Sequence, residues 1–403
     1  MSQNSSVAAE RRRDATTDGR VPMAIYCTYF GIDSHLRTTT ICALTPEDGE
    51  LRTRTFKGND YGEMAEWMAG FPQPSHGVYE SGCTGFVPAR MLTRGDTLVE
   101  PVASSKLPSS ADSRSRKNDR RDAERLARLA LAGEVSPVWV PPEQVEGLRE
   151  LAQAMDDLAC VREAARQRVN AILCRHGISW DERTPTGRLK KRWGQHFWNW
   201  LRSIDLGDAG SQAAYLAALS AAESAEVAYD ELRARAEGIA RVSDLGPPVV
   251  ALMCVKGVGF SSALAFAAEV GDFSRFASGR KVTSYFGLAP SESSSAESRR
   301  LGRISRNGCA LVRKLLIEGA WVLARGNPAC RKRGGTSVPL AIREHARACS
   351  GRLLGRRREL VSRGLMPCKA NTATAAEMAR MLLYIGRDAQ EAAALAAEVA
   401  LVA

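Results

Sequence analysis

Three short strand-like runs follow one another at residues 24–57, and they limit the possible fold more than any other feature. The runs read AIYCTYFGID, TTTICALT and LRTRTFK, and the turn PEDG separates the second from the third. Short runs of β-branched and aromatic residues bounded by turn residues are typical of neighbouring antiparallel strands. The sequence therefore predicts a three-stranded β-meander near the start of the chain.

Helices and strands alternate after this meander. A helical segment at residues 61–70 precedes the strand HGVYE, and a helix at about 87–93 precedes the strand TLVEPVA. The order β-β-β-α-β-α-β indicates an α/β sheet layer. A Ser-, Lys- and Arg-rich loop at residues 104–118 leads into a helix at about 119–132, and PVWVPP at 137–142 marks the end of this domain.

Four carboxylates stand where such a sheet would bring them together. Asp33 ends the first strand, Glu80 ends a later one, and KNDRRDA places Asp119 and Asp122 three residues apart on one helix face. Four carboxylates at one sheet edge suit two Mg²⁺ ions about 3.5–4 Å apart on a phosphodiester. Each acid alone also fits a turn or a solvated salt-bridge face. Their order along the chain is the layout of an RNase H-like nuclease fold.

The middle of the chain is helical. Apolar residues recur at three- and four-residue spacing over residues 144–176 and 211–241, which predicts a helical hairpin or coiled coil. The segment between them, RLKKRWGQHFWNWL, is basic and aromatic and fits either a packed helical cap or a nucleic-acid contact. A further domain begins after the prolines at 247–248 with a helix–GVG–helix pattern, and the last part, from residue 374, is an Ala-rich helix.

Charge points to a polyanionic partner. The net charge is +11, and residues 299–363 alone carry 17 lysines and arginines against three glutamates, a local charge of +14. Nucleic acid is the first expectation and an anionic membrane surface the second. No run of 18 apolar residues, no secretory signal and no paired cysteine motif is present, so a cytoplasmic protein without a transmembrane segment is expected.

Several motifs together resemble a known family. They are GIDSH, ESGCTG and KNDRRDAERLA in the first half, then VKGVGFSSALAFAAEVGDFSRF, SYFGLAPSESSS and LGRISRNGCALVRKLL. In this order they resemble the DEDD transposases of the bacterial insertion sequence 110 group, relatives of the pilin-gene invertases. The resemblance covers about residues 24–135 and 247–325. It implies an RNase H-like (RuvC-like) N-terminal domain, a helical or coiled-coil linker, and a mostly helical C-terminal transposase domain that carries a serine.

The resemblance also implies site residues. The acidic, metal-binding tetrad of the family falls on Asp33, Glu80, Asp119 and Asp122. The family's serine, five residues after the proline of GLAP, falls on Ser295, with Ser293 and Ser294 as alternatives in the same run. Family members usually have glycine after this serine, whereas this chain has Ala296.

The implied activity is DNA strand cleavage and rejoining through a phosphoserine intermediate, with Mg²⁺ or Mn²⁺ as cofactor. The implied partners are donor and target DNA, a non-coding bridge RNA, and further copies of the chain in a dimer or tetramer. Two alternatives stay open: a hydrolytic nuclease of the Holliday-junction type, which needs only the tetrad, and a non-enzymatic nucleic-acid-binding scaffold.

Basic residues near these motifs are expected to contact nucleic-acid phosphates. They are Lys117, Arg120, Arg121, Lys256, Arg299, Arg300, Arg303, Arg306, Arg313 and Lys314. The GVG at 257–259 fits either a backbone approach to a phosphate or a tight turn between helices. The five histidines are expected to be structural, and only His35 stands near the predicted chemistry.

Five segments are predicted. They are a disordered leader (1–22, with Met23 as an alternative start), the RNase H-like domain (23–142), the helical region (143–246), the serine-bearing domain (247–365) and a helical tail (366–403).

Overall fold

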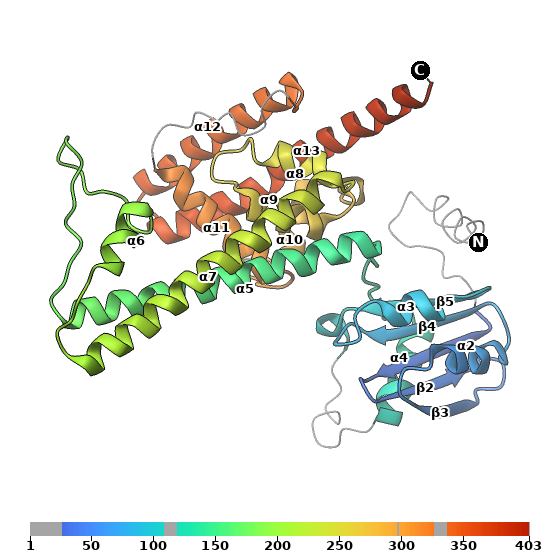
Figure 1. The fold of residues 1–403 in the computed structure, drawn as a ribbon. Coiled ribbons are helices and arrows are strands. Elements are labelled where there is room, and N and C mark those ends of the chain that lie inside the picture. Colours follow the sequence, from blue (N-terminus) through green and yellow to red (C-terminus); the bar gives the residue numbers. More distant parts are fainter. Residues whose placement is uncertain (1–25, 109–118, 296–297, 326–336, 403) are drawn as a thin grey trace. The chain divides into compact units, whose positions relative to one another are not determined.

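The computed structural model describes residues 26–108, 119–295, 298–325 and 337–402 of the 403-residue chain, with backbone alone for residues 292–301 and the last helical residues. The predicted leader lies outside these residues. The chain forms two compact units, residues 1–141 and residues 142–403, which are drawn in Figure 1.

The first unit is built on a five-stranded sheet. Its strands are β1 (Thr28–Ser34), β2 (Thr38–Leu44), β3 (Leu51–Lys57), β4 (Ser75–Glu80) and β5 (Thr97–Val102). They lie in the order β3-β2-β1-β4-β5, with β1, β2 and β3 antiparallel and β4 and β5 parallel to β1. The predicted meander and the alternation that follows it are confirmed, and the fold is consistent with an RNase H-like domain.

Helices cover both faces of this sheet because side chains alternate along each strand. Phe30 and Ile32 of β1 pack with Met64 of α2 (Tyr61–Ala69) and with α3 (Val87–Leu92). On the opposite face, Tyr29 and the β4 residue Val78 pack against α4 (Asp119–Leu131). A short 3₁₀ turn, η1 (Ser104–Lys106), follows β5.

Gly31 allows α4 to lie directly on β1. A Cβ atom at this position would be 1.9 Å from the carbonyl oxygen of Ala123 and 2.4 Å from the backbone nitrogen of Ala127. Ala123 and Ala127 are fully buried. A glycine in the strand facing two alanines in the helix therefore brings the two backbones together next to Asp33.

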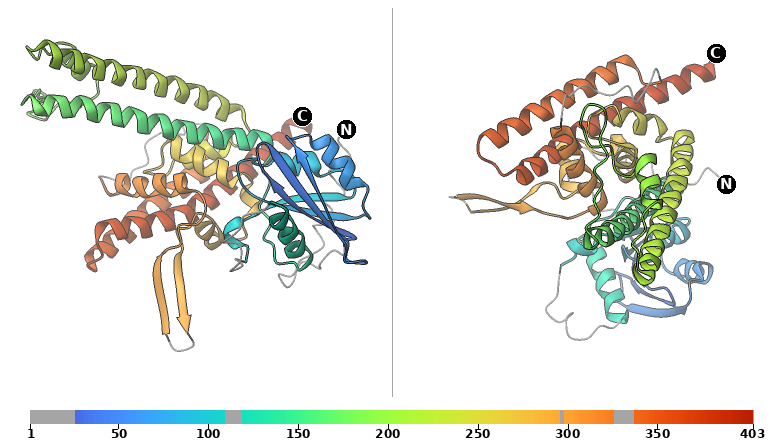
Figure 2. Two further views of the ribbon diagram at one scale, coloured as in Figure 1. Left: turned by 90° about the horizontal axis from the view of Figure 1, so that it is seen from below. Right: turned by 60° about the vertical axis from the view of Figure 1, so that its left-hand side comes forward.

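The second unit contains the predicted helical hairpin. Helices α5 (Glu143–Arg175) and α7 (Ala209–Val242) lie side by side over most of their length, as both views of Figure 2 show. Because α5 and α7 carry their apolar residues at helical spacing, each buries one face against the other.

The segment that connects α5 to α7 in the sequence forms an aromatic cap. Phe197 of α6 (Gln195–Arg202) is buried, with its ring 5.1 Å from that of Trp180 and 5.0 Å from that of Trp193. The Tyr215 hydroxyl donates a hydrogen bond to the Leu201 carbonyl at 2.7 Å. Of the two interpretations of this segment, the aromatic side chains therefore fit the packed cap.

The rest of the second unit is a helical body. It contains α8 (Gly246–Leu252), α9 (Phe260–Val270), η3 (Phe273–Arg275), α10 (Gly279–Tyr285), α11 (Ala310–Ala324), α12 (Leu340–Ser362) and α13 (Pro367–Val402). Helix α13 contacts α8, α10, α11 and α12, and its residues Met378, Leu382 and Ile385 are fully buried. The Ala-rich helix predicted at the end of the chain is present, and it is central to the packing of this unit.

A two-stranded ribbon interrupts the helices. Strands β6 (Pro290–Ser295) and β7 (Ser298–Ile304) pair antiparallel and extend from the helical body, as the left view of Figure 2 shows. At its base, a Cβ on Gly308 would be 1.9 Å from the Tyr285 carbonyl oxygen. No strand is predicted from sequence for this Ser-rich run, so the paired strands are a finding of the structure. Among the described residues, no helix has the length and apolar run needed to cross a membrane.

Candidate active site

Asp33 and Glu80 reach the same edge of the sheet. Strands β1 and β4 are parallel, with Ile32 paired to Tyr79, so Asp33 and Glu80 are the next residues along each strand. Ile32 and Tyr79 belong to the core between the sheet and α2. Alternation therefore assigns Asp33 and Glu80 to the opposite face, which α4 covers. The sequence predicted that the carboxylates share one sheet edge, and the structure brings Asp33 and Glu80 to the same edge.

Three side chains converge at this edge. Ligand atoms of Asp33, His35 and Asp119 all lie within 4.8 Å of one another, and the His35 Nε2 to Asp33 Oδ2 distance is 3.2 Å. Asp122, one turn further along α4, acts on Asp33 through charge repulsion. Within the described part of the chain, Asp122 and Glu80 lie outside the 4.8 Å group, and Glu80 is exposed at the end of β4.

The electrostatics at Asp33 are unfavourable for its own charge. Burial raises the pKa of the Asp33 carboxyl above its ordinary value, and the charges of Asp119 and Asp122 add to this, while His35 opposes it. The buried Oδ2 atom of Asp33 faces the His35 imidazole, whose Nε2 atom is 3.2 Å away. A largely buried carboxylate beside a second acid and an imidazole is a donor set that fits a divalent cation.

His35 is the site residue that sequence reasoning assigned elsewhere. Its backbone N–H donates to the Thr38 carbonyl at 2.9 Å, which closes the short turn between β1 and β2 and holds the imidazole beside Asp33. From sequence the histidines are expected to be structural, and only His35 stands near the predicted chemistry, two residues after the acid that ends a strand.

The serine run lies on the ribbon of the second unit. In backbone register, Ser295 pairs with Ser298 at the end of β6, Ser294 pairs with Arg299, and Ser293 pairs with Arg300.

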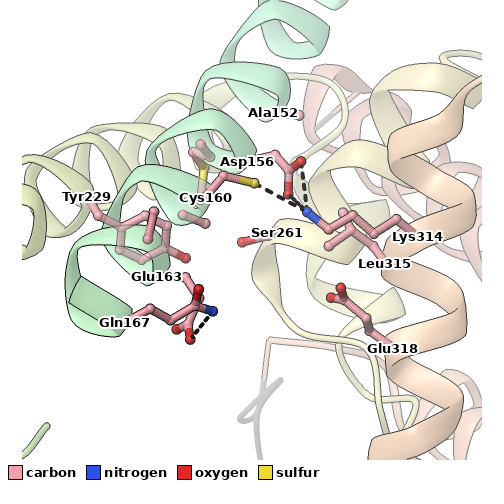
Figure 3. Close-up of a pocket in the computed structure, with 13 residues that line it drawn as sticks. Ala152, Asp156, Cys160, Glu163, Gln167, Tyr229, Ser261, Lys314, Leu315 and Glu318 are labelled. Atoms are coloured by element: carbon pink, nitrogen blue, oxygen red, sulfur yellow. Dashed lines mark hydrogen bonds and ion pairs between the residues drawn. The ribbon is translucent and has the colours of Figure 1, made fainter. Parts of the chain in front are cut away.

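Some of the basic residues are held by the protein itself. The Arg313 guanidinium donates to the carbonyls of Phe286, Asn307 and Gly308 at 3.1, 2.7 and 3.0 Å, and it thereby ties the base of the ribbon to α11. Lys314 donates to both carboxylate oxygens of Asp156 on α5, at 2.8 and 3.1 Å (Figure 3). These two cations are therefore less available to phosphate than their sequence context indicated.

The GVG motif also has a structural explanation. Gly257 has φ +92°, and a Cβ there would be 2.3 Å from the Gly319 carbonyl oxygen of α11. This packing fits the tight turn between helices. Lys256 beside it donates its Nζ hydrogen to the Arg325 carbonyl at 3.2 Å.

The remaining basic residues differ in surroundings. Arg303 is exposed on β7, Arg306 is exposed just after this strand, and Arg121 is exposed on α4. Arg120 pairs with Glu124 at 3.4 Å. Arg299 and Arg300 are described by their backbone, and Lys117 lies outside the described residues. As sites of nucleic-acid contact, all of these stay predictions.

A sheet in this strand order, with acids on β1, on β4 and on the helix packed against β1, defines a DEDD-type domain of the RNase H-like class. The family model of IS110-type DEDD transposases matches residues 30–177, and the model of the transposase IS116/IS110/IS902 family matches residues 250–334. The chain therefore belongs to the IS110 family of transposases and is a DNA transposase.

Individual relatives agree with this assignment. A Sinorhizobium fredii protein named as a transposase, y4qE, is 31% identical over 389 residues, which cover 93% of this chain and 92% of that protein. The transposase for insertion sequence element IS1111A of Coxiella burnetii is 27% identical, over 53% of this chain and 56% of its own length. The transposase for IS1533 of Leptospira borgpetersenii is 26% identical, over 63% and 72%.

Proposed function

We propose that this transposase cuts and rejoins DNA strands of a bacterial insertion sequence through a phosphoserine intermediate. In this proposal the acidic tetrad Asp33, Glu80, Asp119 and Asp122 holds the metal, and Ser295 is the nucleophile. The observation that carries the proposal is the convergence of Asp33, Asp119 and His35 at one edge of the sheet, with ligand atoms within 4.8 Å of one another.

The acidic site is suited to phosphate chemistry. When bound there, Mg²⁺ or Mn²⁺ supplies positive charge that stabilises the phosphate oxygens during in-line displacement. Asp33 and Asp119 contribute oxygen ligands from β1 and α4, and Asp122 and Glu80 complete the donor set. Burial of Asp33 excludes water from one side of the site, which strengthens the electrostatic interactions within it.

The serine step conserves the phosphodiester bond energy. The Ser295 hydroxyl attacks a DNA phosphorus atom, so that the Oγ–P bond forms and the P–O3′ bond breaks. The hydroxyl proton passes to a tetrad carboxylate, and the departing 3′ oxygen takes a proton to become a free hydroxyl. Attack by the 3′ hydroxyl of a partner strand then forms a new P–O3′ bond and releases the serine.

The partners follow from charge and from family membership. Donor and target DNA are the substrates, and a non-coding bridge RNA that base-pairs with both selects them. The exposed Arg303 on β7 and the exposed Arg306 just after it support a contact with nucleic-acid phosphates close to the serine. In this proposal a dimer or tetramer of the chain brings the tetrad of one subunit to the serine of another.

The experiment uses the full chain co-expressed with the non-coding RNA that flanks its element. End-labelled DNA spanning an element junction is incubated with protein and Mg²⁺ and separated on a denaturing gel. We expect strand cleavage by the wild type and by Asp230→Asn, a control acid exposed on α7. Asp33→Asn is expected to bind the DNA without cleaving it. Cleavage by Asp33→Asn at the wild-type rate would contradict the proposed metal site. Cleavage without the RNA would contradict the proposal that the RNA guides the protein to its DNA.

A further inference from the structure

The spacing between His35 and Asp33 is that of two ligands on one ion. Bonds of about 2.0–2.2 Å to an octahedral cation place adjacent ligand atoms about 3 Å apart. The observed Nε2–Oδ2 distance is 3.2 Å, and both atoms are within 4.8 Å of an Asp119 carboxylate oxygen. The two atoms are therefore close enough to bind one cation together, and without a cation the imidazole pairs with the Asp33 carboxylate.

The turn that carries His35 holds the imidazole at this position. The His35 N–H donates to the Thr38 carbonyl, and the flanking pair Ser34 and Thr39 is in register between β1 and β2. The turn is therefore a direct extension of two paired strands, which limits how far the ring can move from Asp33.

A comparison within the same sheet separates His35 from a core histidine. The His76 side chain is 10% exposed and pairs with Glu100 at 3.1 Å in the interior of the unit. The His35 side chain is 38% exposed and faces the carboxylates at the sheet edge. Packing therefore explains the position of His76. Packing does not explain His35, whose side chain is more exposed and lies beside carboxylates that suit a cation.

We propose that His35 is a direct nitrogen ligand of the metal centre, in addition to the acidic tetrad. This inference rests on the proposed function, because it needs a cation at Asp33 and Asp119. Imidazole nitrogen binds transition-metal ions more strongly than it binds Mg²⁺, for which carboxylate and water oxygen are the preferred ligands. His35 thus gives the site a preference for Mn²⁺ over Mg²⁺ that the carboxylates alone would not provide.

The test measures Mn²⁺ binding to the full chain, independently of activity. Free Mn²⁺ is quantified by electron paramagnetic resonance during titration, and pulsed measurements on the bound ion detect coupling to ¹⁴N of a directly bound imidazole. We expect this coupling in the wild type and its loss in His35→Ala and His35→Gln. We also expect the Mn²⁺ affinity of both variants to fall by about tenfold or more, with a smaller loss for Mg²⁺ measured by competition.

Two control variants match the perturbation. Leu36→Ala changes the neighbouring residue, whose side chain is 76% exposed, without removing a ligand. His196→Ala removes an exposed histidine of the second unit. Both should bind Mn²⁺ with wild-type affinity and keep the ¹⁴N coupling, which assigns the signal to His35. Circular dichroism establishes that each variant is folded.

The outcomes separate this inference from the proposed function. A wild-type protein that binds Mn²⁺ without ¹⁴N coupling would overturn the role of His35, as would unchanged or tighter binding by His35→Gln, which is expected if the imidazole competes with the cation for Asp33. In either case, loss of Mn²⁺ binding in Asp33→Asn would leave the carboxylate site standing. Wild-type Mn²⁺ affinity in Asp33→Asn would instead refute the carboxylate site itself.

Discussion

Replacing Gly31 with alanine tests how the first unit positions its acids. The added Cβ would lie 1.9 Å from the Ala123 carbonyl oxygen, and contacts under 3.0 Å to such atoms essentially never occur. Helix α4 must therefore retreat from β1 by about 1 Å, because the atoms that the new Cβ meets belong to the helix backbone and cannot rotate away. The same movement carries Asp119 away from Asp33.

Two effects of different kind follow from that displacement. Overpacking a buried strand–helix contact is expected to lower the free energy of unfolding by about 3 kcal/mol. A misplacement of about 1 Å at the site is expected to lower the rate of strand cleavage by about 100-fold in the protein that stays folded. Metal affinity should fall with it, because the ligands from α4 no longer reach those from β1.

The assay combines equilibrium unfolding by denaturant, followed by circular dichroism, with Mg²⁺-dependent cleavage of junction DNA. Gly147→Ala is the matched control, because a Cβ at this position on α5 meets no atom within 4 Å. It should stabilise the protein by about 0.5–1 kcal/mol and leave cleavage unchanged. Wild-type stability and wild-type metal affinity in Gly31→Ala would refute the close contact of α4 with β1, and with it the reasoning that joins Asp119 to Asp33.

Further predictions concern the acids and the basic residues. Asp119→Asn should abolish strand cleavage while DNA binding persists; loss of binding together with retained cleavage would contradict its metal role. Burial raises the pKa of Asp33, so its ionisation destabilises the metal-free protein as pH rises through that raised pKa. Asp33→Asn should therefore melt at a higher temperature than the wild type at pH 7 without divalent ions, with no gain below the ordinary carboxyl range, and calorimetry across pH tests this. Arg303→Ala should weaken DNA binding and reduce its salt dependence, whereas Arg313→Ala should lower the melting temperature because three carbonyls lose their donor.

The succession of strands along the chain could be predicted because its signals are local. The runs around β1, β2 and β3 are short, rich in β-branched and aromatic residues, and bounded by turns. The long helices α5 and α7 could be predicted for a similar reason, since their apolar residues repeat over many turns. The end of a strand also fixes where its last side chain lies, so the sheet edge reached by Asp33 was accessible from sequence.

The roles of Gly31 and His35 at the acidic site could not be predicted from the local sequence pattern. Gly31 matters because of Ala123, which is 92 residues away in sequence and meets it only in the folded unit. His35 lies beside Asp33 and Asp119 because the turn after β1 folds back beside α4. That contact joins segments distant in sequence. Its place two residues after Asp33 was visible, but proximity in sequence does not establish that two side chains converge.

The ribbon of β6 and β7 was missed because its residues have weak strand preference. Serine-rich runs favour loops when judged by composition, and here the pairing depends on the tight base at Gly287 and Gly308. The aromatic segment that contains α6 could be assigned only after the structure showed its rings packed on one another. In both cases contacts distant in sequence outweigh the local signal.

The most direct test of the account is a search for a covalent protein–DNA adduct. The full chain with its non-coding RNA, Mg²⁺ and end-labelled junction DNA is run on a denaturing gel with and without protease. We predict a protease-sensitive adduct in the wild type that is absent in Ser295→Ala. An adduct that still forms in Ser295→Ala would identify Ser293 or Ser294 as the nucleophile instead. Strand cleavage without any adduct would contradict the phosphoserine mechanism and identify a hydrolytic nuclease.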